Sequence, residues 1–123
     1  MRPAVLSIST ERIFAPIRDA VLANAGYGVI PAISLESALR ILRERHVCAM
    51  VIASSVPSWE RQLLCLEGGR RGIPTVVLDP YQEATDVQSP LHINPLDGPE
   101  AFLDALAGLL LRDHQLCVTG ARC

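Results

Sequence analysis

The chain has 123 residues, of which 50% are hydrophobic and 20% charged, and its formal net charge is −2. This length suits one domain with a sizeable core, and the composition excludes a disordered chain. The slight negative charge and an aromatic content of 4% argue against a basic or base-stacking surface for nucleic acid.

The first half of the chain alternates apolar runs with helical patterns. Residues 3–8 predict a strand, and apolar residues at helical spacing predict a helix over residues 13–25 that ends at Gly26. A second strand is expected over residues 28–32. Ser34 then suits the cap position of a second helix, because its hydroxyl can accept from main-chain N–H groups of the first turn.

The stretch from His46 to Pro57 is the expected centre of the sheet. It is short, almost continuously apolar and rich in β-branched residues, which is typical of a strand covered by helices on both faces. Within this stretch, Ser54 and Ser55 are the polar residues that follow the apolar run. A third helix is expected from residue 57 or 58 to about Glu67, ended by the glycine pair at positions 68 and 69.

The second half contains two more strand patterns and one strong helix pattern. Residues 74–78 predict a fourth strand and residues 91–93 a short fifth, whereas residues 81–90 show little amphipathic pattern. A last helix is expected from Pro99, with an apolar stripe that ends near Leu110. Because residues 113–123 show no clear period, we divide the chain into a domain of residues 1–112 and a C-terminal tail of residues 113–123.

Alternating strands and helices predict right-handed crossovers and a parallel sheet. The spacing is close to that of flavodoxin-like domains, which are three-layer α/β/α sandwiches. We therefore expect a five-stranded parallel sheet in the order 2-1-3-4-5, with ligands, if any, at the carboxyl ends of the strands.

The cysteines and the hydropathy pattern bear on location and cofactors. The cysteines stand at positions 48, 65, 117 and 123, and this spacing matches no zinc pattern, so we expect neither a metal nor another cofactor. No apolar stretch is long enough to span a membrane, and the N-terminus lacks a signal pattern. We expect a soluble, cytoplasmic protein that contacts no membrane.

From about residue 3 to residue 111 the chain resembles the receiver domain of two-component response regulators. The fragments that carry the resemblance are Val5–Ile8 with the polar residues after it, Gly26-Tyr27, Cys48–Pro57, Ile73–Leu78 and Ile93–Leu96. Each fragment is weak alone, but their order and spacing together are specific. The resemblance implies the receiver fold and a role in phosphorelay signal transduction.

The residues that perform the family's chemistry are replaced, beginning with the first and third strands. Receivers hold magnesium with paired carboxylates at the end of the first strand, where this chain has Ser9 and Thr10, with only Glu11 beside them. The phosphate-accepting aspartate aligns with Ala53, which has no nucleophile. The acidic pocket and the phospho-acceptor position are therefore both degenerate.

The fourth and fifth strands depart from the family in the same way. The switch hydroxyl aligns with Asp79 and the phosphate-binding lysine with Asn94. Residues 80–92 leave too little chain for the usual fourth helix, so we expect that helix to be shortened or missing. The chain thus resembles a degenerate pseudo-receiver that lacks the phosphorylation site.

The resemblance implies a phosphorylation-independent, receiver-like signalling module that acts through protein–protein interaction in a two-component-type pathway and is not an enzyme. The candidate partners are a sensor kinase, another regulator or a second copy of the chain in a homodimer. The first helix and the exposed side of the last helix are the expected contact surfaces. A plain oligomerisation module is a related alternative.

Two alternatives use the polar residues at the strand ends. The first is a small-ligand-binding or enzymatic flavodoxin-like domain, with a site formed from Ser9, Thr10, Ser54, Ser55, Asp79 and Asn94. No histidine falls at these positions, so they lack a nucleophile–base pair. The second is phosphorylation relocated to a serine at position 54 or 55 or to the aspartate at position 79, which the missing magnesium carboxylates make unfavourable.

Overall fold

The computed structural model describes residues 3–11, 13, 15–78, 91–93 and 99–118, and for residues 91–93 and 111–118 the backbone alone. Its strands form one parallel sheet with the strand order β2-β1-β3-β4-β5. In chain order the strands are β1 (Ala4–Ile8), β2 (Gly28–Ala32), β3 (Ala49–Ile52), β4 (Thr75–Leu78) and β5 (Leu91–Ile93). Pro31 is compatible with β2 because this strand lies at the sheet edge, where a missing N–H donor is tolerated.

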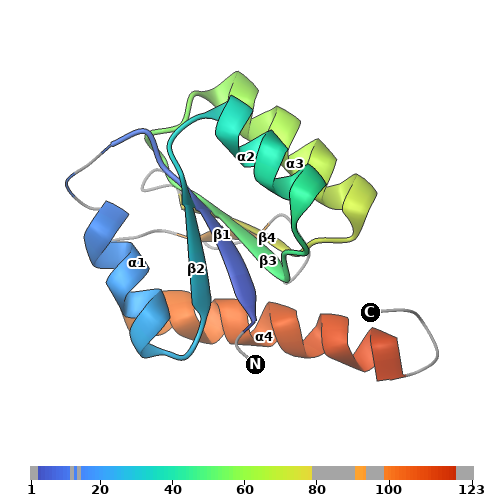
Figure 1. Cartoon of the computed structure of the whole chain (residues 1–123). Helices are drawn as coiled ribbons and strands as arrows, with labels where there is room; N and C mark the ends of the chain where they lie inside the picture. The colour runs from blue at the N-terminus through green and yellow to red at the C-terminus, as the bar shows by residue number, and fades with distance from the viewer. Residues whose placement is uncertain (1–2, 12, 14, 79–90, 94–98, 119–123) are drawn as a thin grey trace.

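Helices cover both faces of the sheet (Figure 1). They are α1 (Ala15–Asn24), α2 (Leu35–Glu44), α3 (Ser58–Arg71) and α4 (Pro99–Val118). α2 and α3 lie together on one face, and α1 and α4 lie on the other. The parallel, flavodoxin-like three-layer sandwich expected from the sequence is confirmed. Among the described helices, none combines the length and the apolar character that crossing a bilayer would require.

After β5 the structure differs from the expectation, whereas the expectation for the segment after β4 falls outside the described residues. A fourth helix is present: α4 follows β5 and continues to Val118, across the expected boundary at residue 112. The tail of residues 113–123 is therefore helical at its start, because neither glycine nor proline occurs between Pro99 and Gly120 except Gly108 within the helix. The expected shortening of a helix between β4 and β5 falls on residues 79–90, outside the described part of the chain.

Helix α3 continues past the glycine pair that was expected to end it. Gly68 is buried, and a Cβ built there would lie 2.6 Å from Thr75 Oγ1 and 3.0 Å from Met50 Cε. The helix instead ends at Gly72, whose φ of 69° lies in the left-handed region that favours glycine. Gly68 is thus a packing residue that lets α3 approach β4, and Gly72 is the cap.

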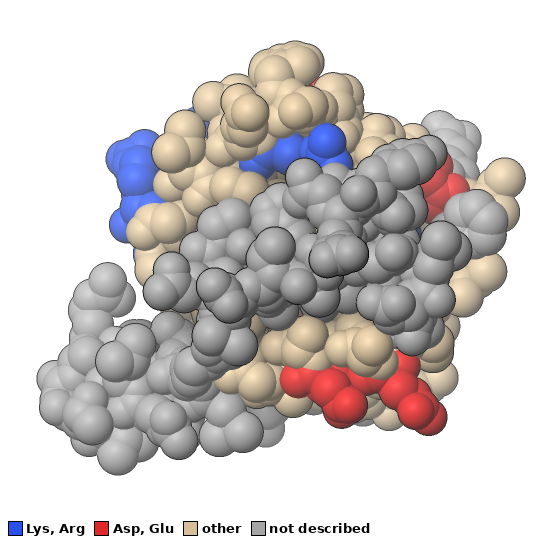
Figure 2. Space-filling view, turned by 180° about the vertical axis from the view of Figure 1, so that it is seen from behind, with Lys and Arg blue, Asp and Glu red and all other residues tan. Residues whose placement is uncertain are grey.

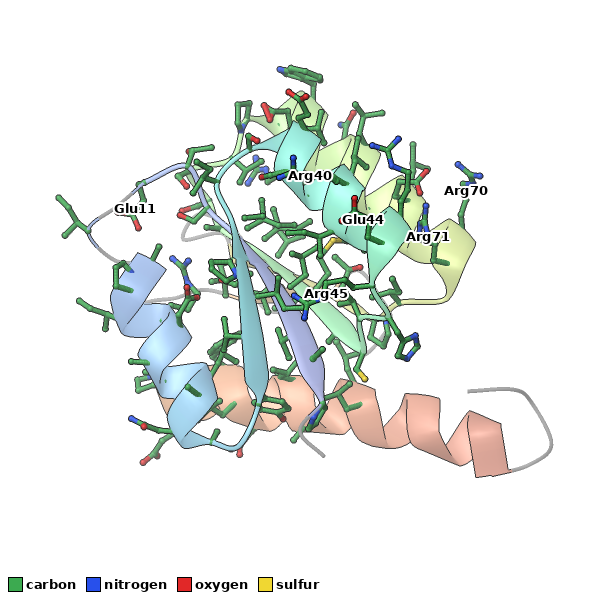
Figure 3. The ribbon with its side chains drawn as sticks, viewed as in Figure 1. Glu11, Arg40, Glu44, Arg45, Arg70 and Arg71 are labelled. Carbon is green, nitrogen blue, oxygen red and sulfur yellow. The ribbon has the colours of Figure 1, made fainter. Side chains whose placement is uncertain are left out.

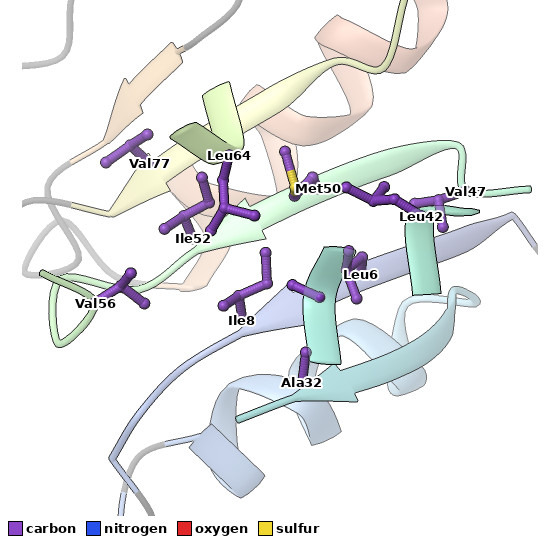
Figure 4. Packing of buried hydrophobic residues seen from close by; sticks show 11 residues of the cluster. Leu6, Ile8, Ala32, Leu42, Val47, Met50, Ile52, Val56, Leu64 and Val77 are labelled. Carbon is purple, nitrogen blue, oxygen red and sulfur yellow. The ribbon is translucent and has the colours of Figure 1, made fainter. Parts of the chain in front are cut away.

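The core has two parts, one on each face of the sheet, because alternate residues of each strand point to opposite faces. The part under α2 and α3 joins Leu6, Met50 and Ile52 of the strands to Leu42 of α2 and Leu64 of α3 (Figure 4). The part under α1 and α4 contains strand residues Val5, Val51 and Val76 together with Leu22, Phe102, Leu106 and Leu109 of the helices. All four residues of β3 and of β4 are buried, as the continuous apolar runs predicted.

Candidate functional site

The ends of β1 and β3 lie side by side, so the polar residues after these strands meet. β1 and β3 are paired in register, and the main-chain N–H of Ala53 donates to the carbonyl of Ile8 at 2.9 Å. Ser9 therefore follows the end of one strand beside the end of the other. This is the edge of the sheet at which the sequence predicted a site.

Ser9, Thr10 and Ser55 are joined by three hydrogen bonds, and we call this group the β1–β3 clasp. The Thr10 N–H donates to Ser55 Oγ at 3.1 Å, and Thr10 Oγ1 donates to the main-chain carbonyl of Ser55 at 2.9 Å. The Ser9 and Ser55 hydroxyl oxygens lie 3.3 Å apart. Within the described residues, the hydroxyls of the clasp bond to one another and to main-chain groups, and to no carboxylate or imidazole.

Glu11, the remaining acid near the first strand, is turned towards its own loop. Its Oε2 accepts from the main-chain N–H of Ile13 at 2.9 Å, and its main-chain N–H donates to Ser9 Oγ at 3.3 Å. Figure 3 shows Glu11 on the segment between β1 and α1, away from the labelled residues of α2 and α3. The described residues contain no group of three or more histidine, cysteine or acidic side chains that could hold a metal ion.

Ala53 is 1% exposed at the end of β3, whereas Ser54 beside it is exposed. A methyl group at this position offers neither a nucleophile nor a ligand. Of the predicted site residues, the structure thus brings Ser9, Thr10 and Ser55 into contact, next to Ala53. Asp79 and Asn94 lie outside the described residues.

A second polar cluster, missed in the sequence analysis, lies between β1 and α1. Ser7 is 3% exposed on the same sheet face as Val5, and its hydroxyl donates to Asp19 Oδ1 of α1 at 2.7 Å. Arg18 is partly buried next to it, and its Nη1 has no hydrogen-bond partner among the residues that the structure describes. Burial lowers the pKa of the Arg18 guanidinium, while the charges of Asp19 and Glu11 oppose that shift.

The signal for this cluster was available in the sequence as a polar residue at an inward position of an apolar strand. Ser7 alternates with Val5, so both face the same helix layer, and a buried hydroxyl there needs an acceptor. Asp19 supplies that acceptor from α1. The cluster therefore fixes α1 against the sheet, and we assign it a structural role.

On the face drawn in Figure 2, the charged side chains of the described residues lie in separate groups. In the view of Figure 2, arginine side chains appear in separate small groups, with acidic groups elsewhere on the same face. The chain carries 11 Lys and Arg against 13 Asp and Glu residues. The described residues of that face thus form no extended positive surface that would suit a phosphate backbone.

Comparison with known proteins shows the fold of the chain. No protein-family model matches the chain, and no curated protein matches it by sequence. Among solved structures, a CheY-like response regulator receiver domain protein from Methanospirillum hungatei superposes with a TM-score of 0.78 at 14% identity, over 94% of this chain and 98% of that one.

Two further solved structures are similar over nearly their whole length. The signal receiver domain of an HD domain-containing protein from Pseudomonas fluorescens gives a TM-score of 0.71 at 19% identity, over 94% of this chain and 99% of that one. A chemotaxis response regulator of Vibrio cholerae gives 0.65 at 14% identity, over 89% of this chain and 99% of that one. The chain therefore has the CheY-like receiver fold.

Proposed function

We propose that this protein is a phosphorylation-independent, receiver-like signalling module that acts through protein–protein interaction in a two-component-type pathway. The observation that carries the proposal is the residue at the end of β3. Ala53 occupies the position that the resemblance assigns to the phosphate acceptor, and it is 1% exposed. An alanine methyl group cannot attack a phosphoryl donor.

The β1–β3 clasp supports the same proposal. In a receiver that is phosphorylated, carboxylates at the end of the first strand would hold a magnesium ion, which prefers oxygen ligands and neutralises charge during the transfer. Here Ser9 and Thr10 stand at those positions and bond to Ser55 and to main-chain groups instead. These neutral hydroxyls join the two strand ends through hydrogen bonds and carry no negative charge that would attract a cation.

The clasp also weighs against the small-ligand or enzymatic alternative. A ligand that used these hydroxyls would have to replace hydrogen bonds already made within the protein, and each broken bond that is not replaced costs about 1 kcal/mol. Among the residues that the structure describes, these hydroxyls also bond to no carboxylate or imidazole that could act as a base and activate a nucleophile. We therefore favour a module that signals by binding another protein through its surface. The partner is a sensor kinase, another regulator or a second copy of the chain.

The test is the intact mass of the protein after incubation with acetyl phosphate and magnesium. The wild-type chain is expected to gain no phosphoryl group, while a receiver that keeps its aspartates gains one under the same conditions. A stoichiometric, magnesium-dependent adduct would contradict the proposal, and peptide mapping would then identify the modified residue. Isothermal titration with magnesium gives an independent check, because a degenerate pocket is expected to release or absorb no heat of binding.

A further inference from the structure

The outward side of α3 carries large apolar side chains. Trp59 is 61% exposed, Leu63 43% and Leu66 66%. Their spacing of four and three residues places them along one line of the helix, because 3.6 residues make a turn. Arg70 continues this line four residues further on, and we call Trp59, Leu63, Leu66 and Arg70 the α3 stripe.

The stripe lies opposite the side of α3 that packs on the sheet. Leu64 is 0% exposed, and Gly68 is also buried; together they form the contact with the sheet. Single exposed leucines are ordinary on protein surfaces, but three large apolar residues in one line are not scattered. The stripe contributes little to the core, so its composition indicates a surface that another molecule covers.

The spacing of the stripe is symmetric, since its members are separated by four, three and four residues. This is the alternation of a and d positions in a heptad pattern. An antiparallel pair of α3 helices related by a two-fold axis would place Leu63 of one chain against Leu66 of the partner subunit. It would also place Trp59 over Arg70 of the partner subunit, which is a favourable cation–aromatic arrangement.

The charges along α3 favour the antiparallel direction. Glu60 lies in the first turn, and Arg70 and Arg71 lie in the last. Two antiparallel helices place the acidic first turn of each beside the basic last turn of the other, so opposite charges meet twice. Glu67 brings no uncompensated charge to the contact, because it is already paired with Arg70 at 2.7 Å and Arg71 at 2.8 Å in its own helix.

Arg70 is positioned to take part in such a contact. Its side chain is 78% exposed, and Figure 3 shows it extending away from the domain at the end of α3. Its pairing with Glu67 uses a single nitrogen, Nη1, in a surface ion pair that contributes little free energy by itself. The rest of the guanidinium is available to lie on an aromatic face.

We propose that the α3 stripe is the contact surface of a symmetric homodimer in which the α3 helices pack antiparallel. This inference rests on the proposed role as a protein-interaction module and adds the partner, which is a second copy of the chain. Three apolar side chains per subunit form a patch smaller than the roughly 800 Å² per partner of a standard interface. The dimer is therefore expected to be weak and reversible, with a dissociation constant in the micromolar range or above.

The experiment combines sedimentation equilibrium with the fluorescence of Trp59, which is the only tryptophan of the chain. From micromolar to millimolar concentration, the average mass of the wild type is expected to rise from monomer to dimer. Over the same range the Trp59 emission is expected to shift to shorter wavelength, because the indole leaves water. If the average mass and the emission wavelength change over the same concentrations, the stripe is part of the dimer contact.

Leu66→Asp is expected to raise the dissociation constant about tenfold or more, because it places a charge at the centre of the contact. The matched control is Ile33→Asp, since Ile33 is 72% exposed and lies outside α3. Ile17→Asp, at a 61% exposed residue of α1, tests the first helix as a rival surface. Both controls are expected to associate as the wild type does.

A charge reversal tests the direction of the pairing. Glu60→Arg is expected to weaken the dimer several-fold, because it brings like charges together across the antiparallel contact. Glu60→Gln, which removes the acidic charge without adding a basic one, is expected to weaken the dimer less than Glu60→Arg does. Glu60 is partly exposed on the surface of the helix, so these variants keep the core of the monomer intact, and circular dichroism checks this.

Three results would overturn the inference: a monomer at every concentration, a dimer that Leu66→Asp leaves intact, or a dimer that Ile17→Asp dissociates. A monomer that still resists acetyl phosphate would leave the proposed function standing with another partner. A phosphorylated protein that still dimerises through α3 would overturn the proposed function and leave the stripe as its contact surface. The two proposals therefore fail separately.

Discussion

Helices α2 and α3 cover the same face of the sheet and differ on the side that faces away from it. Leu42 of α2 and Leu64 of α3 enter the same part of the core. The outward side of α2 is charged and includes Glu36, Arg40, Arg43 and Glu44, two of which are labelled in Figure 3. The outward side of α3 instead carries the apolar members of the α3 stripe. Packing on the sheet therefore constrains the inner side of each helix and leaves the outer side free to differ.

The two helices also begin and end differently. α2 starts with a capping box, in which the Ser34 hydroxyl accepts from the Ser37 N–H at 3.1 Å and the Ser37 hydroxyl accepts from the Ser34 N–H at 3.2 Å. α3 starts after Pro57 with no side-chain cap and ends at the left-handed Gly72. The stability of α2 thus depends more on side chains at its own start, whereas the stability of α3 depends more on its contact with the sheet.

The largest contrast is expected between the two sides of α3. Leu64→Ala removes a fully buried side chain and is expected to lower the free energy of unfolding by about 2–5 kcal/mol. Leu66→Ala removes a side chain that is 66% exposed, so its effect on the monomer is expected to stay within about 0.5 kcal/mol. Urea unfolding at low protein concentration measures both. Equal losses would show that the stripe is part of the core.

The adjacent glycines of α3 are expected to respond with opposite signs. Gly68→Ala would place a methyl group against Thr75 and Met50 and is expected to destabilise the protein by about 1–3 kcal/mol. At Gly69 a Cβ has nothing within 4 Å, so Gly69→Ala is expected to stabilise the helix by about 0.5–1 kcal/mol. Thermal or urea unfolding of the two variants measures both changes in stability. A stabilised Gly68→Ala variant would mean that α3 does not approach β4 as closely as described.

The helix starts provide a smaller contrast. Ser34→Ala removes the capping box of α2 and is expected to cost about 1 kcal/mol of stability. Ser58→Ala, at the first residue of α3, serves as the control, because α3 has no side-chain cap to lose. Unfolding in urea compares the two. If Ser58→Ala cost as much as Ser34→Ala, α3 would depend on its own cap as α2 does.

The smallest effect is expected from the charges at the end of α3. The hydrogen bond from Arg71, with the nearby charge of Arg70, lowers the pKa of the Glu67 carboxyl below its ordinary value. A lowered pKa in the folded state means that the stabilisation is present above the unfolded-state pKa and is lost as pH falls through the folded-state value.

Stability measured between neutral and acidic pH should therefore fall slightly more for the wild type than for Glu67→Gln. Because these charges are at the surface, the difference should shrink further in high salt. If salt left this difference in stability unchanged, the ion pairs of Glu67 would be more buried than the structure shows.

Much of the fold could be predicted because its signals are local. The continuous apolar run around β3 and the helical periods of α2 and α4 depend only on neighbouring residues, and the structure has these three elements, although α4 continues past its expected end. The end of α3 could not be predicted in this way. A glycine inside a helix and a glycine after it look alike in sequence, and the difference arises from the side chain of Thr75 on a neighbouring strand.

In the candidate site, too, some features follow from the sequence alone and others only from tertiary contacts. The sequence by itself determined which side chains stand at these strand ends: an alanine at position 53 and hydroxyls at positions 9 and 10, none of which is a carboxylate. Only the tertiary structure decided what those hydroxyls do, since Thr10 and Ser55 are 45 residues apart and meet through the pairing of β1 with β3. It also decided that Trp59, Leu63 and Leu66 face solvent, because the helical period fixes which residues share a side of α3 and only packing against the sheet selects which side is buried.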